Sequence, residues 1–500
     1  MKLKSLWISD YKNLHDCEVV FEQHSLLNVV IGSNGSGKSN LIEAILQILI
    51  GVYFKRLPVF DFNFIFEVRE NQVKLRKSER VISVIVNDER VSLLHFVDQL
   101  RTGGDHGWFP SLIFVYYSGE CQRVRKLIRR YQLHFSKITS HAEAEDQRPL
   151  FVESTNQQSQ VILLALFAHG HVEFLAKLGI AEILDVSLEL RSPDYFDSYR
   201  HEPVLWNTTG TVSLIISALN DTAATQRSQK KPKTGKVNIA DDIPLIETRV
   251  YGFNNADRKS ETIRELAELL GHRGDNLYSA LEHLRSRGIF RSVKFRLRAA
   301  NGGELFDFDQ LSEGEKQLIA VIGALMLTKQ SDNLVLLDEP DTHLNPHWSW
   351  DYPSMLAESF DPGQEKRSVV LMATHDPVMI SGLTKEQVHL AHRRSENPHV
   401  FTRPLRDPRG QGIANLLCSQ EFFGLPSSLD KETQKLLDER LKISIKAELS
   451  GADKARLRIL NEKLQIITPG VSERDPKFVE FLRAKQKKTN TDHASHRSCY

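Results

Sequence analysis

The sequence predicts an α/β fold built on buried parallel strands, with a mostly helical insertion and a helical C-terminal extension. Three observations favour this fold class. The mostly apolar run Leu26–Ile31 leads into a glycine-rich turn and then into a helical pattern, Ser39–Ile50. A second apolar run, Leu334–Leu337, is followed by two carboxylates, and a third, Val369–Thr374, by a histidine. Continuous apolar runs are typical of parallel strands buried on both faces, whose carboxyl ends gather functional groups.

The composition excludes disorder of the whole chain, because 41% of the 500 residues are hydrophobic and can form a core. The 65 Lys+Arg nearly cancel the 64 Asp+Glu, which argues against a generic nucleic-acid coat. One local basic stretch is Lys431–Tyr500, with 16 Lys+Arg and 10 Asp+Glu. The other consists of five cations at helical spacing: Arg123, Arg125, Lys126, Arg129 and Arg130. A solvated face is the simpler interpretation of each stretch, and a partner or nucleic-acid surface is the alternative.

Cysteine usage and apolar runs predict a cytoplasmic protein without a membrane anchor. The four cysteines lie far apart and none belongs to a CxxC pair, so neither a disulfide framework nor a zinc site is expected. The N-terminal residues lack the apolar core of a signal peptide. The longest apolar stretch, Leu41–Phe54, is shorter than the ~20 residues that span a bilayer.

Changes in pattern divide the chain into four segments. Residues 1–120 form a first α/β lobe with the glycine-rich loop, and residues 121–287 form the mostly helical insertion. Residues 288–425 form a second α/β lobe, and residues 426–500 form the helical extension with a polar tail. A polar run rich in lysine near 221–242 predicts a flexible loop within the insertion.

Residue periodicity places further elements in these segments. Strands are expected at Val81–Val86 and Leu112–Tyr117. Helical patterns occur in the insertion and the extension, at Gln160–Leu178, Glu261–Leu270, Asn276–Arg287, Lys431–Ala447, Asp453–Gln465 and Pro476–Gln486. The helices of the extension form either a packing appendage or a partner-binding element, and the sequence leaves both open.

The glycine-rich turn Gly32–Ser39 reads GSNGSGKS and matches the phosphate-binding pattern G-x-x-x-x-G-K-[ST] between a strand and a helix. Its glycines let the backbone fold around a phosphate, and the following helix points its positive end at the same anion. Lys38 would reach the β and γ phosphates of ATP, and Ser39 would hold Mg²⁺. A chance glycine-rich turn does not explain both flanking elements. The expected ATP-binding residues here are Gly32, Ser33, Asn34, Gly35, Ser36, Gly37, Lys38, Ser39 and Asn40.

The carboxylates that follow the second apolar run complement this loop. Asp338 would bind the Mg²⁺ directly or through water, and Glu339 would polarise the attacking water as general base. His375, at the end of the third run, could contact the γ-phosphate or that water. Taken alone, His375 is more simply explained as a surface histidine.

A third motif, Leu311–Leu318, reads LSEGEKQL and is expected to open a helix. Ser312 and Glu315 have the spacing of a capping box, which explains both residues structurally. A capping box does not explain Gly314, because glycine is unfavourable in a helix. A glycine at this position is expected if an anion approaches the backbone.

Together these motifs resemble the ABC-type ATPase heads of the SMC/RecF-like class of P-loop NTPases. That class has a Walker A loop, a signature motif, a Walker B strand, a D-loop and a switch histidine. The resemblance implies that Ser312 and Gly314 of the signature contact ATP held by a second subunit. By the same resemblance, Glu315 of the signature and Asp341 of the D-loop Asp341–Asn345 are ATP-binding residues. It also implies that ATP joins heads into a homodimer or higher homo-oligomer. Gln122 is the candidate for the Q-loop glutamine of the class.

The chain differs from two branches of this class. Lys38 and Ser312 lie 274 residues apart without a sustained heptad pattern, so the long coiled coil of SMC proteins is excluded. After His375 there is neither the acidic cluster of OLD-type nucleases nor an HNH pattern. We therefore expect an ATPase without a nuclease centre of its own.

Three further stretches resemble the PtuA-like ATPases of the Septu anti-phage system and their retron-associated relatives: Tyr116–Glu120, His343–Trp348 and Gly412–Asp430. This resemblance implies a separate HNH nuclease partner, PtuB-like, whose activity the nucleotide state controls, and contact with nucleic acid through that complex. A RecF-like DNA-repair ATPase that clamps DNA directly is the alternative. Whether ATP activates or restrains the nuclease stays open.

Overall fold

The computed structural model describes most of the chain, and its contacts divide the chain into two compact units, Met1–Ile413 and Ala414–Tyr500. The described residues are 1–79, 81–101, 107–118, 124–131, 151–153, 156–193, 206, 208, 210–232, 245–254, 262–271, 277–301, 303–328, 332–360, 368–392, 400–444 and 449–467.

A seven-stranded sheet forms the centre of the first unit, in the order β18-β17-β3-β16-β15-β8-β9. All neighbours pair in parallel except β17 and β18. The strands are β3 Leu27–Ile31, β8 Leu112–Tyr117, β9 Phe151–Glu153, β15 Asn333–Asp338, β16 Val369–Thr374, β17 Val388–His392 and β18 Val400–Thr402. Every residue of β3, β15 and β16 is buried, as their apolar runs predicted. The three runs are therefore adjacent strands, and the expected α/β fold is confirmed.

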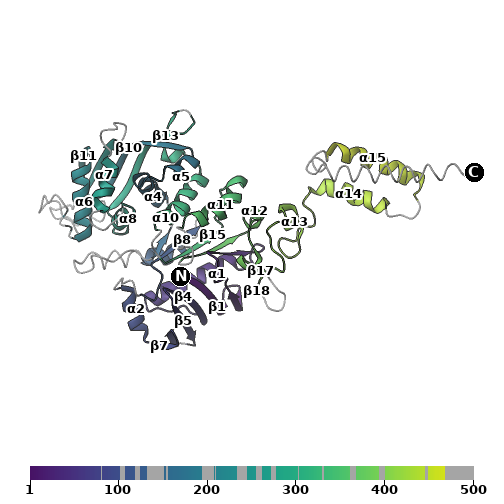
Figure 1. Cartoon of the computed structure of the whole chain (residues 1–500), viewed down its shortest axis with the longest axis horizontal. Helices are drawn as coiled ribbons and strands as arrows, with labels where there is room; N and C mark the ends of the chain where they lie inside the picture. Colours follow the sequence, from purple (N-terminus) through teal and green to yellow (C-terminus); the bar gives the residue numbers. More distant parts are fainter. Residues whose placement is uncertain are drawn as a thin grey trace, which may run out of the picture. The chain divides into compact units, whose positions relative to one another are not determined.

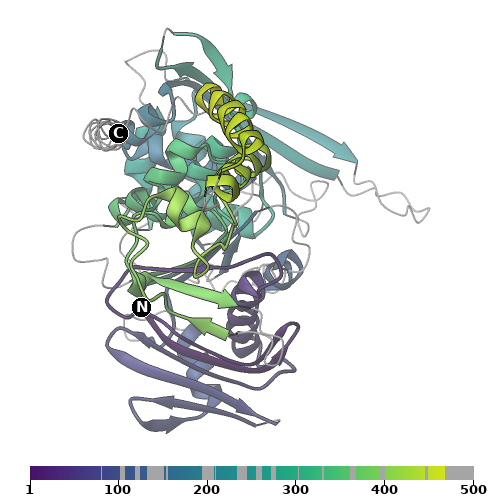
Figure 2. The ribbon, with the colours of Figure 1, turned by 90° about the vertical axis from the view of Figure 1, so that its right-hand side faces the viewer.

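An antiparallel sheet lies on the other side of helix α1 Lys38–Tyr53, in the order β2-β1-β4-β5-β6-β7. Its strands are β1 Lys2–Tyr11, β2 Leu14–Val20, β4 Phe62–Val68, β5 Asn71–Ser78, β6 Val81–Val86 and β7 Glu89–Val91, and helix α2 Leu93–Arg101 follows. Helix α1 is buried nearly all round, because its apolar residues face both sheets in one continuous core. Figures 1 and 2 show α1 between the two sheets.

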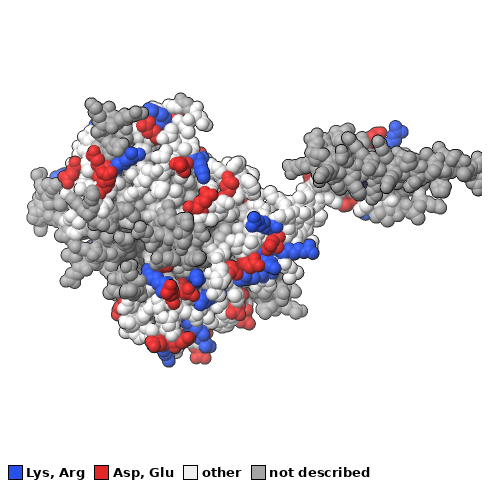
Figure 3. Space-filling model, viewed as in Figure 1, with Lys and Arg blue, Asp and Glu red and all other residues white. Residues whose placement is uncertain are grey.

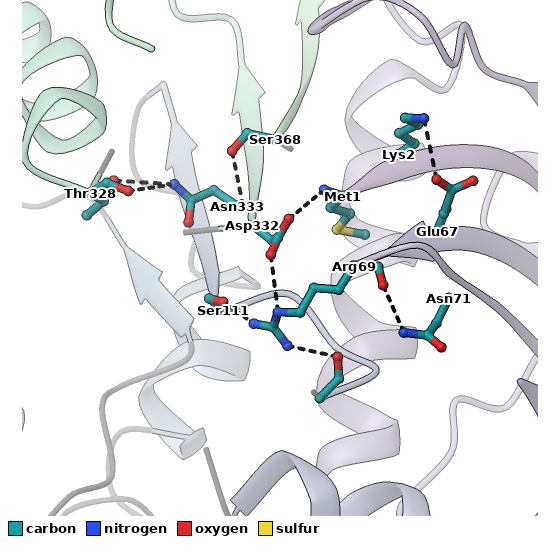
Figure 4. Close-up of polar contacts among 11 residues, drawn as sticks. Met1, Lys2, Glu67, Arg69, Asn71, Ser111, Thr328, Asp332, Asn333 and Ser368 are labelled. Atoms are coloured by element: carbon teal, nitrogen blue, oxygen red, sulfur yellow. Dashed lines mark hydrogen bonds and ion pairs between the residues drawn. The ribbon is translucent and has the colours of Figure 1, made fainter. Parts of the chain in front are cut away.

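Polar contacts fasten the antiparallel sheet to the start of β15 (Figure 4). The buried carboxylate of Asp332 lies 3.1 Å from Nε of Arg69 and 3.4 Å from the amino group of Met1. Arg69, in the turn between β4 and β5, also donates to the carbonyl of Gly107 at 2.8 Å. The backbone of Ser111, just before β8, donates to the carbonyl of Asp332 at 2.9 Å. The beginnings of β8 and β15 are thus fixed to each other and to the antiparallel sheet.

The middle of the chain contains a five-stranded antiparallel sheet, in the order β11-β12-β10-β13-β14, drawn in teal in Figures 1 and 2. Its strands are β10 Ile180–Arg191, β11 Thr225–Pro232, β12 Leu245–Asn254, β13 Phe290–Ala299 and β14 Leu305–Asp307. The accompanying helices are α4 Asn156–Ala168, α5 Val172–Lys177, α6 Gly210–Thr222, α7 Thr262–Gly271 and α8 Leu277–Ser286. The helices α7 and α8 agree with two expected helices, whereas the expected helix Gln160–Leu178 is divided into α4 and α5. The helical interpretation of this segment also omitted the sheet.

The flexible loop expected near 221–242 is wrong for Thr225–Pro232, which form strand β11. This strand pairs with β12 along its whole length, from Thr225 opposite Gly252 to Pro232 opposite Leu245. Residues 225–230 are exposed, because β11 lies at the sheet edge. An exposed edge strand is held by backbone hydrogen bonds and needs no apolar pattern. Residues 233–242 of the expected loop lie outside the described residues.

The signature motif lies at the start of a composite helix in the first unit. Helix α9 Glu313–Leu318 continues into the π-helical turn Ile319–Gly323 and then into α10 Ala324–Leu327. This helix packs closely on α4: a Cβ added at Gly323 would lie 2.6 Å from Cγ2 of Ile162. Two further helices complete the segment that follows the central strands, α11 Pro346–Glu358 and α12 Pro377–Ile380.

The second unit contains two packed helices, α14 Lys431–Ser444 and α15 Gly451–Ile467, which confirm two expected helices. Arg456 of α15 forms a bidentate ion pair with Glu439 of α14. Its Nε lies 2.7 Å from Oε1 and its Nη2 lies 2.9 Å from Oε2. A short helix, α13 Ile413–Cys418, precedes them. The expected helix at 476–486 lies outside the described residues. Among the helices that the structure describes, none combines the length and apolar character required to cross a membrane.

Charged side chains of both signs are mixed on one face of the described part of the protein. On the face shown in Figure 3, positive and negative side chains alternate over the coloured surface without a field of one sign. Residues 124–131 form a helix that buries Val124, Ile128 and Tyr131. The expected basic run lies on the opposite face, with Arg125, Lys126, Arg129 and Arg130 exposed; Arg123 lies outside the described residues.

Candidate functional site

The phosphate-binding loop connects β3 to α1 at the carboxyl edge of the parallel sheet. Gly37 has φ +98°, and a Cβ there would lie 2.6 Å from Cδ2 of Leu14, so only glycine fits. Nζ of Lys38 donates to the loop carbonyls of Gly32 at 2.8 Å and Ser33 at 3.3 Å. Burial lowers the pKa of Lys38, while the carboxylates of Glu339, Asp338 and Asp341 raise it. The ammonium group is therefore held inside the loop, next to the acids.

The turn between β1 and β2 braces this loop, a role that the sequence did not reveal. Nδ2 of Asn13 donates to the carbonyl of Gly35 at 2.8 Å, and Oδ1 of Asn13 accepts from Asn40 at 2.6 Å. Lys12 pairs with the buried carboxylate of Glu43 in α1. Asn13 and Gly35 are 22 residues apart, so no local pattern in the turn indicates the contact.

The Walker A and Walker B motifs meet through Ser39 and Asp338. Oγ of Ser39 donates to Oδ1 of Asp338 at 3.0 Å, across 299 residues of sequence. Burial raises the pKa of Asp338 to about 6, against the hydrogen bonds from Ser39 and Tyr117. A hydroxyl and a carboxylate beside a phosphate-binding loop are the oxygen ligands that Mg²⁺ takes in nucleotide sites. The pair therefore fits the expected metal.

Glu339 leaves the strand in an unusual backbone conformation. Its φ is +50°, which costs a non-glycine residue about 1–2 kcal/mol. Its N–H donates to the carbonyl of Ala373 at 2.8 Å, so the residue stays tied to β16 after β15 has ended. The carboxylate Oε1 lies 3.3 Å from Nδ1 of His375; the histidine is exposed and Glu339 is half-buried. This geometry places a carboxylate and a histidine side by side at the carboxyl ends of β15 and β16.

The D-loop joins the same edge of the sheet. Oδ1 of the buried Asp341 accepts from Oγ1 of Thr374, the last residue of β16, at 2.9 Å. Burial raises the pKa of Asp341, against the hydrogen bond from Thr374. Six of the predicted site residues thus converge at the carboxyl ends of β3, β15 and β16: Lys38, Ser39, Asp338, Glu339, Asp341 and His375.

The signature residues form the expected capping box within their own helix turn. The backbone N–H of Ser312 donates to Oε2 of Glu315 at 2.7 Å, and Oγ of Ser312 accepts from the N–H of Glu315 at 3.3 Å. Gly314 is buried, and a Cβ there would lie 2.6 Å from the carbonyl of His343. Close packing on the D-loop segment of the same chain therefore explains this glycine without an anion. Gln122, the Q-loop candidate, lies outside the described residues.

This arrangement defines a P-loop ATPase. Models of two domain families match the chain. The "AAA ATPase domain" family matches residues 1–166, which include the phosphate-binding loop. The family "AAA domain, putative AbiEii toxin, Type IV TA system" matches residues 183–381, which include the signature motif, the Walker B strand and the histidine.

Two relatives are similar to the chain. Septu protein PtuA of Bacillus mycoides (strain KBAB4) is 26% identical over 268 residues, which are 50% of this chain and 34% of the relative. The match thus spans about a third of the length of that protein. The Retron Vc95 probable ATPase of Vibrio cholerae serotype O1 biovar El Tor is 19% identical over 87% of this chain and 82% of the relative. The resemblance to PtuA-like and retron-associated ATPases is confirmed.

Solved structures of P-loop ATPase heads are also similar. An Smc head bound to the C-winged helix domain of ScpA is 12% identical with a TM-score of 0.37, covering 81% of this chain and 98% of that one. The recombination mediator RecF with ATP is 13% identical with a TM-score of 0.29, covering 75% of this chain and 92% of that one.

Proposed function

We propose that this chain is the ATP-binding and ATP-hydrolysing subunit of a bacterial anti-phage defence complex, and that its nucleotide state gates a separate HNH nuclease. The observation that carries the ATPase part is the hydrogen bond between Ser39 and Asp338 beside the contact between Glu339 and His375. The similarity to a Septu protein and to a retron ATPase supports the defence setting.

The proposed reaction uses the residues that converge at the sheet edge. The backbone of Gly32–Ser39 binds the phosphates of ATP, and Lys38 moves from the loop carbonyls onto the β and γ phosphates. Ser39 and Asp338 would hold Mg²⁺, which neutralises charge on the phosphates when it is bound. Glu339 takes a proton from the attacking water, and His375 orients Glu339 and the water at the γ-phosphate.

The signature residues complete the site of a second copy in this proposal. Ser312 is exposed, and its hydrogen bonds to Glu315 leave it at the surface of its own chain. Two heads would therefore share each ATP, with the exposed Ser312 of one copy, at the start of the signature turn that also contains Gly314 and Glu315, against the loop of the other. Binding and loss of ATP would then change how the two heads meet. That change would hold or release the PtuB-like HNH nuclease, together with the nucleic acid that the nuclease brings to the complex.

Co-expression with a PtuB-like HNH nuclease tests the proposal. We expect the two proteins to purify together and DNA cleavage to differ between ATP, ADP and a non-hydrolysable analogue. The Lys38→Ala variant should retain the nuclease but lose this nucleotide dependence. A chain that purifies alone and binds duplex DNA tightly would instead favour the RecF-like clamp.

A further inference from the structure

The run Tyr116–Glu120 is a part of the sequence to which the proposed reaction assigns no role. Its described portion ends β8 next to the two acids, because β8 pairs with β15 from Asn333 opposite Leu112 to Asp338 opposite Tyr117. Ser118 then follows directly beside the point where Glu339 leaves the strand. We propose that Ser118 and Thr342 are positioning residues that hold Glu339 in its catalytic geometry, an inference that rests on the proposed ATPase function.

A chain of hydroxyl hydrogen bonds connects these residues. Oγ of Ser118 donates to Oγ1 of Thr342 at 2.7 Å, and Oγ1 of Thr342 donates to the carbonyl of Glu339 at 2.9 Å. The backbone N–H of Thr342 adds a second, longer bond to the same carbonyl at 3.3 Å. The N–H of Ser118 donates to the carbonyl of Asp338 at 3.0 Å. The backbone carbonyl groups of Asp338 and Glu339 are therefore both held by hydrogen bonds from Ser118 and Thr342.

This hydroxyl chain acts on a residue that needs external support. Glu339 has φ +50°, a conformation that a non-glycine residue keeps only when its surroundings hold it. Its N–H is fixed by Ala373 on one side, and its carbonyl is fixed by Thr342 on the other. Rotation of the Glu339 backbone would break one of these hydrogen bonds. It would also move the carboxylate away from His375, whose Nδ1 lies 3.3 Å from Oε1 of Glu339.

Because the two hydroxyl groups lie near the surface, their effect on the position of Glu339 can be distinguished from an effect on protein stability. Thr342 is exposed and Ser118 is partly exposed, so water can replace their hydrogen bonds when a hydroxyl is removed. The loss should therefore change the stability of the protein little. It should change turnover more, because a reacting group displaced by a fraction of an ångström loses much of its effect.

Thr342→Val tests the assignment, since valine keeps the shape of threonine without the hydroxyl. We expect kcat for ATP hydrolysis to fall about 10-fold or more, with KM for ATP and the unfolding temperature close to wild type. Thr342→Ser restores the hydroxyl and should restore kcat. Ser118→Ala should lower kcat less, and the double variant should not fall below Thr342→Val, because both act through one chain of bonds.

The matched control is Thr222→Val in α6, where the hydroxyl also donates to a backbone carbonyl, that of Ala218, at 2.7 Å. This variant should leave kcat unchanged. Wild-type kcat in a folded Thr342→Val protein, or a raised KM in place of a lowered kcat, overturns the positioning role. If Thr342→Val does not fold, unchanged kcat in Ser118→Ala overturns it. Failure of the wild type itself to hydrolyse ATP refutes the proposed function instead.

Discussion

Two regions differ in how completely each is assembled within one chain. One is the Walker edge, the edge of the parallel sheet that holds Lys38, Ser39, Asp338 and Glu339, and the other is the signature helix α9. At the Walker edge, Lys38 is buried, and Ser39 bonds to Asp338, a residue far away in sequence. At the signature helix, Ser312 is exposed and bonds to Glu315, three residues away. The difference teaches that one chain can build the phosphate and metal side of the site alone. The signature residues make only local contacts, so the role proposed for them at the nucleotide of a second copy has to be tested by experiment.

The largest effect is expected at the Walker edge, from Glu339→Gln. The amide keeps the size of the side chain but cannot accept the proton of the attacking water. ATP turnover should fall by about 10²–10⁴-fold, the usual contribution of a general base. Binding of a fluorescent ATP analogue should remain, and phosphate release measures the turnover. Glu182→Gln, which changes an exposed carboxylate paired with Arg298, serves as control. Hydrolysis by Glu339→Gln at the wild-type rate would refute the general-base role.

A smaller effect is expected from Lys38→Ala at the same edge. The variant loses charged hydrogen bonds to the phosphates, each of which contributes about 1.5–3 kcal/mol. Affinity for ATP should therefore fall by about 10- to 100-fold or more. Titration with the fluorescent analogue measures this loss, and circular dichroism confirms folding. An unchanged affinity in a folded variant would show that the loop does not bind the phosphates in this way.

Mixing two variants, each impaired on one side of the site, compares the two regions directly. Lys38→Ala damages the Walker side and Ser312→Arg damages the signature side. If the sites are shared between copies, a mixed dimer retains one intact composite site, and an equal mixture should recover about a quarter of wild-type turnover. Each variant alone provides the control. If mixing recovers no activity although mixed dimers form, the signature does not act across the interface.

The smallest effect is expected from Gly314→Ala, which probes packing rather than chemistry. The new Cβ would lie 2.6 Å from the backbone carbonyl of His343, which cannot move freely. We expect the free energy of unfolding to fall by about 1–3 kcal/mol, as measured by urea denaturation. Gly451→Ala, at a helical position where an added Cβ meets nothing within 4 Å, is the matched control. Equal stability of both variants would refute the packing explanation for Gly314.

The sequence predicted the elements whose signal is contiguous. Strands β6, β8 and β16 have the predicted bounds, because each is one apolar run closed by polar residues. The phosphate-binding loop was equally readable, since all its residues lie between one strand and one helix. Strand β11 was missed because an exposed edge strand carries no burial pattern.

Other features could not be predicted from the sequence, because they depend on residues that only the fold brings together. Asn13 contacts Gly35 across 22 residues of sequence, and Thr342 contacts Ser118 across 224 residues. The positive φ of Glu339 has no sequence signal, because glutamate seldom adopts it and only the neighbouring strands impose it. The sequence thus predicts which residues act, whereas their bracing comes from the tertiary structure.

The π-helical turn Ile319–Gly323 has a consequence for the direction in which the signature faces. A π turn holds one residue more than the α turn it replaces. Each residue turns an α-helix by about 100°, so the extra residue changes the face of the helix on which Ser312 lies relative to α10. Gly323, at the end of the π turn, packs closely on Ile162 and Leu166. The direction of the signature therefore depends on one additional residue inside a single helix.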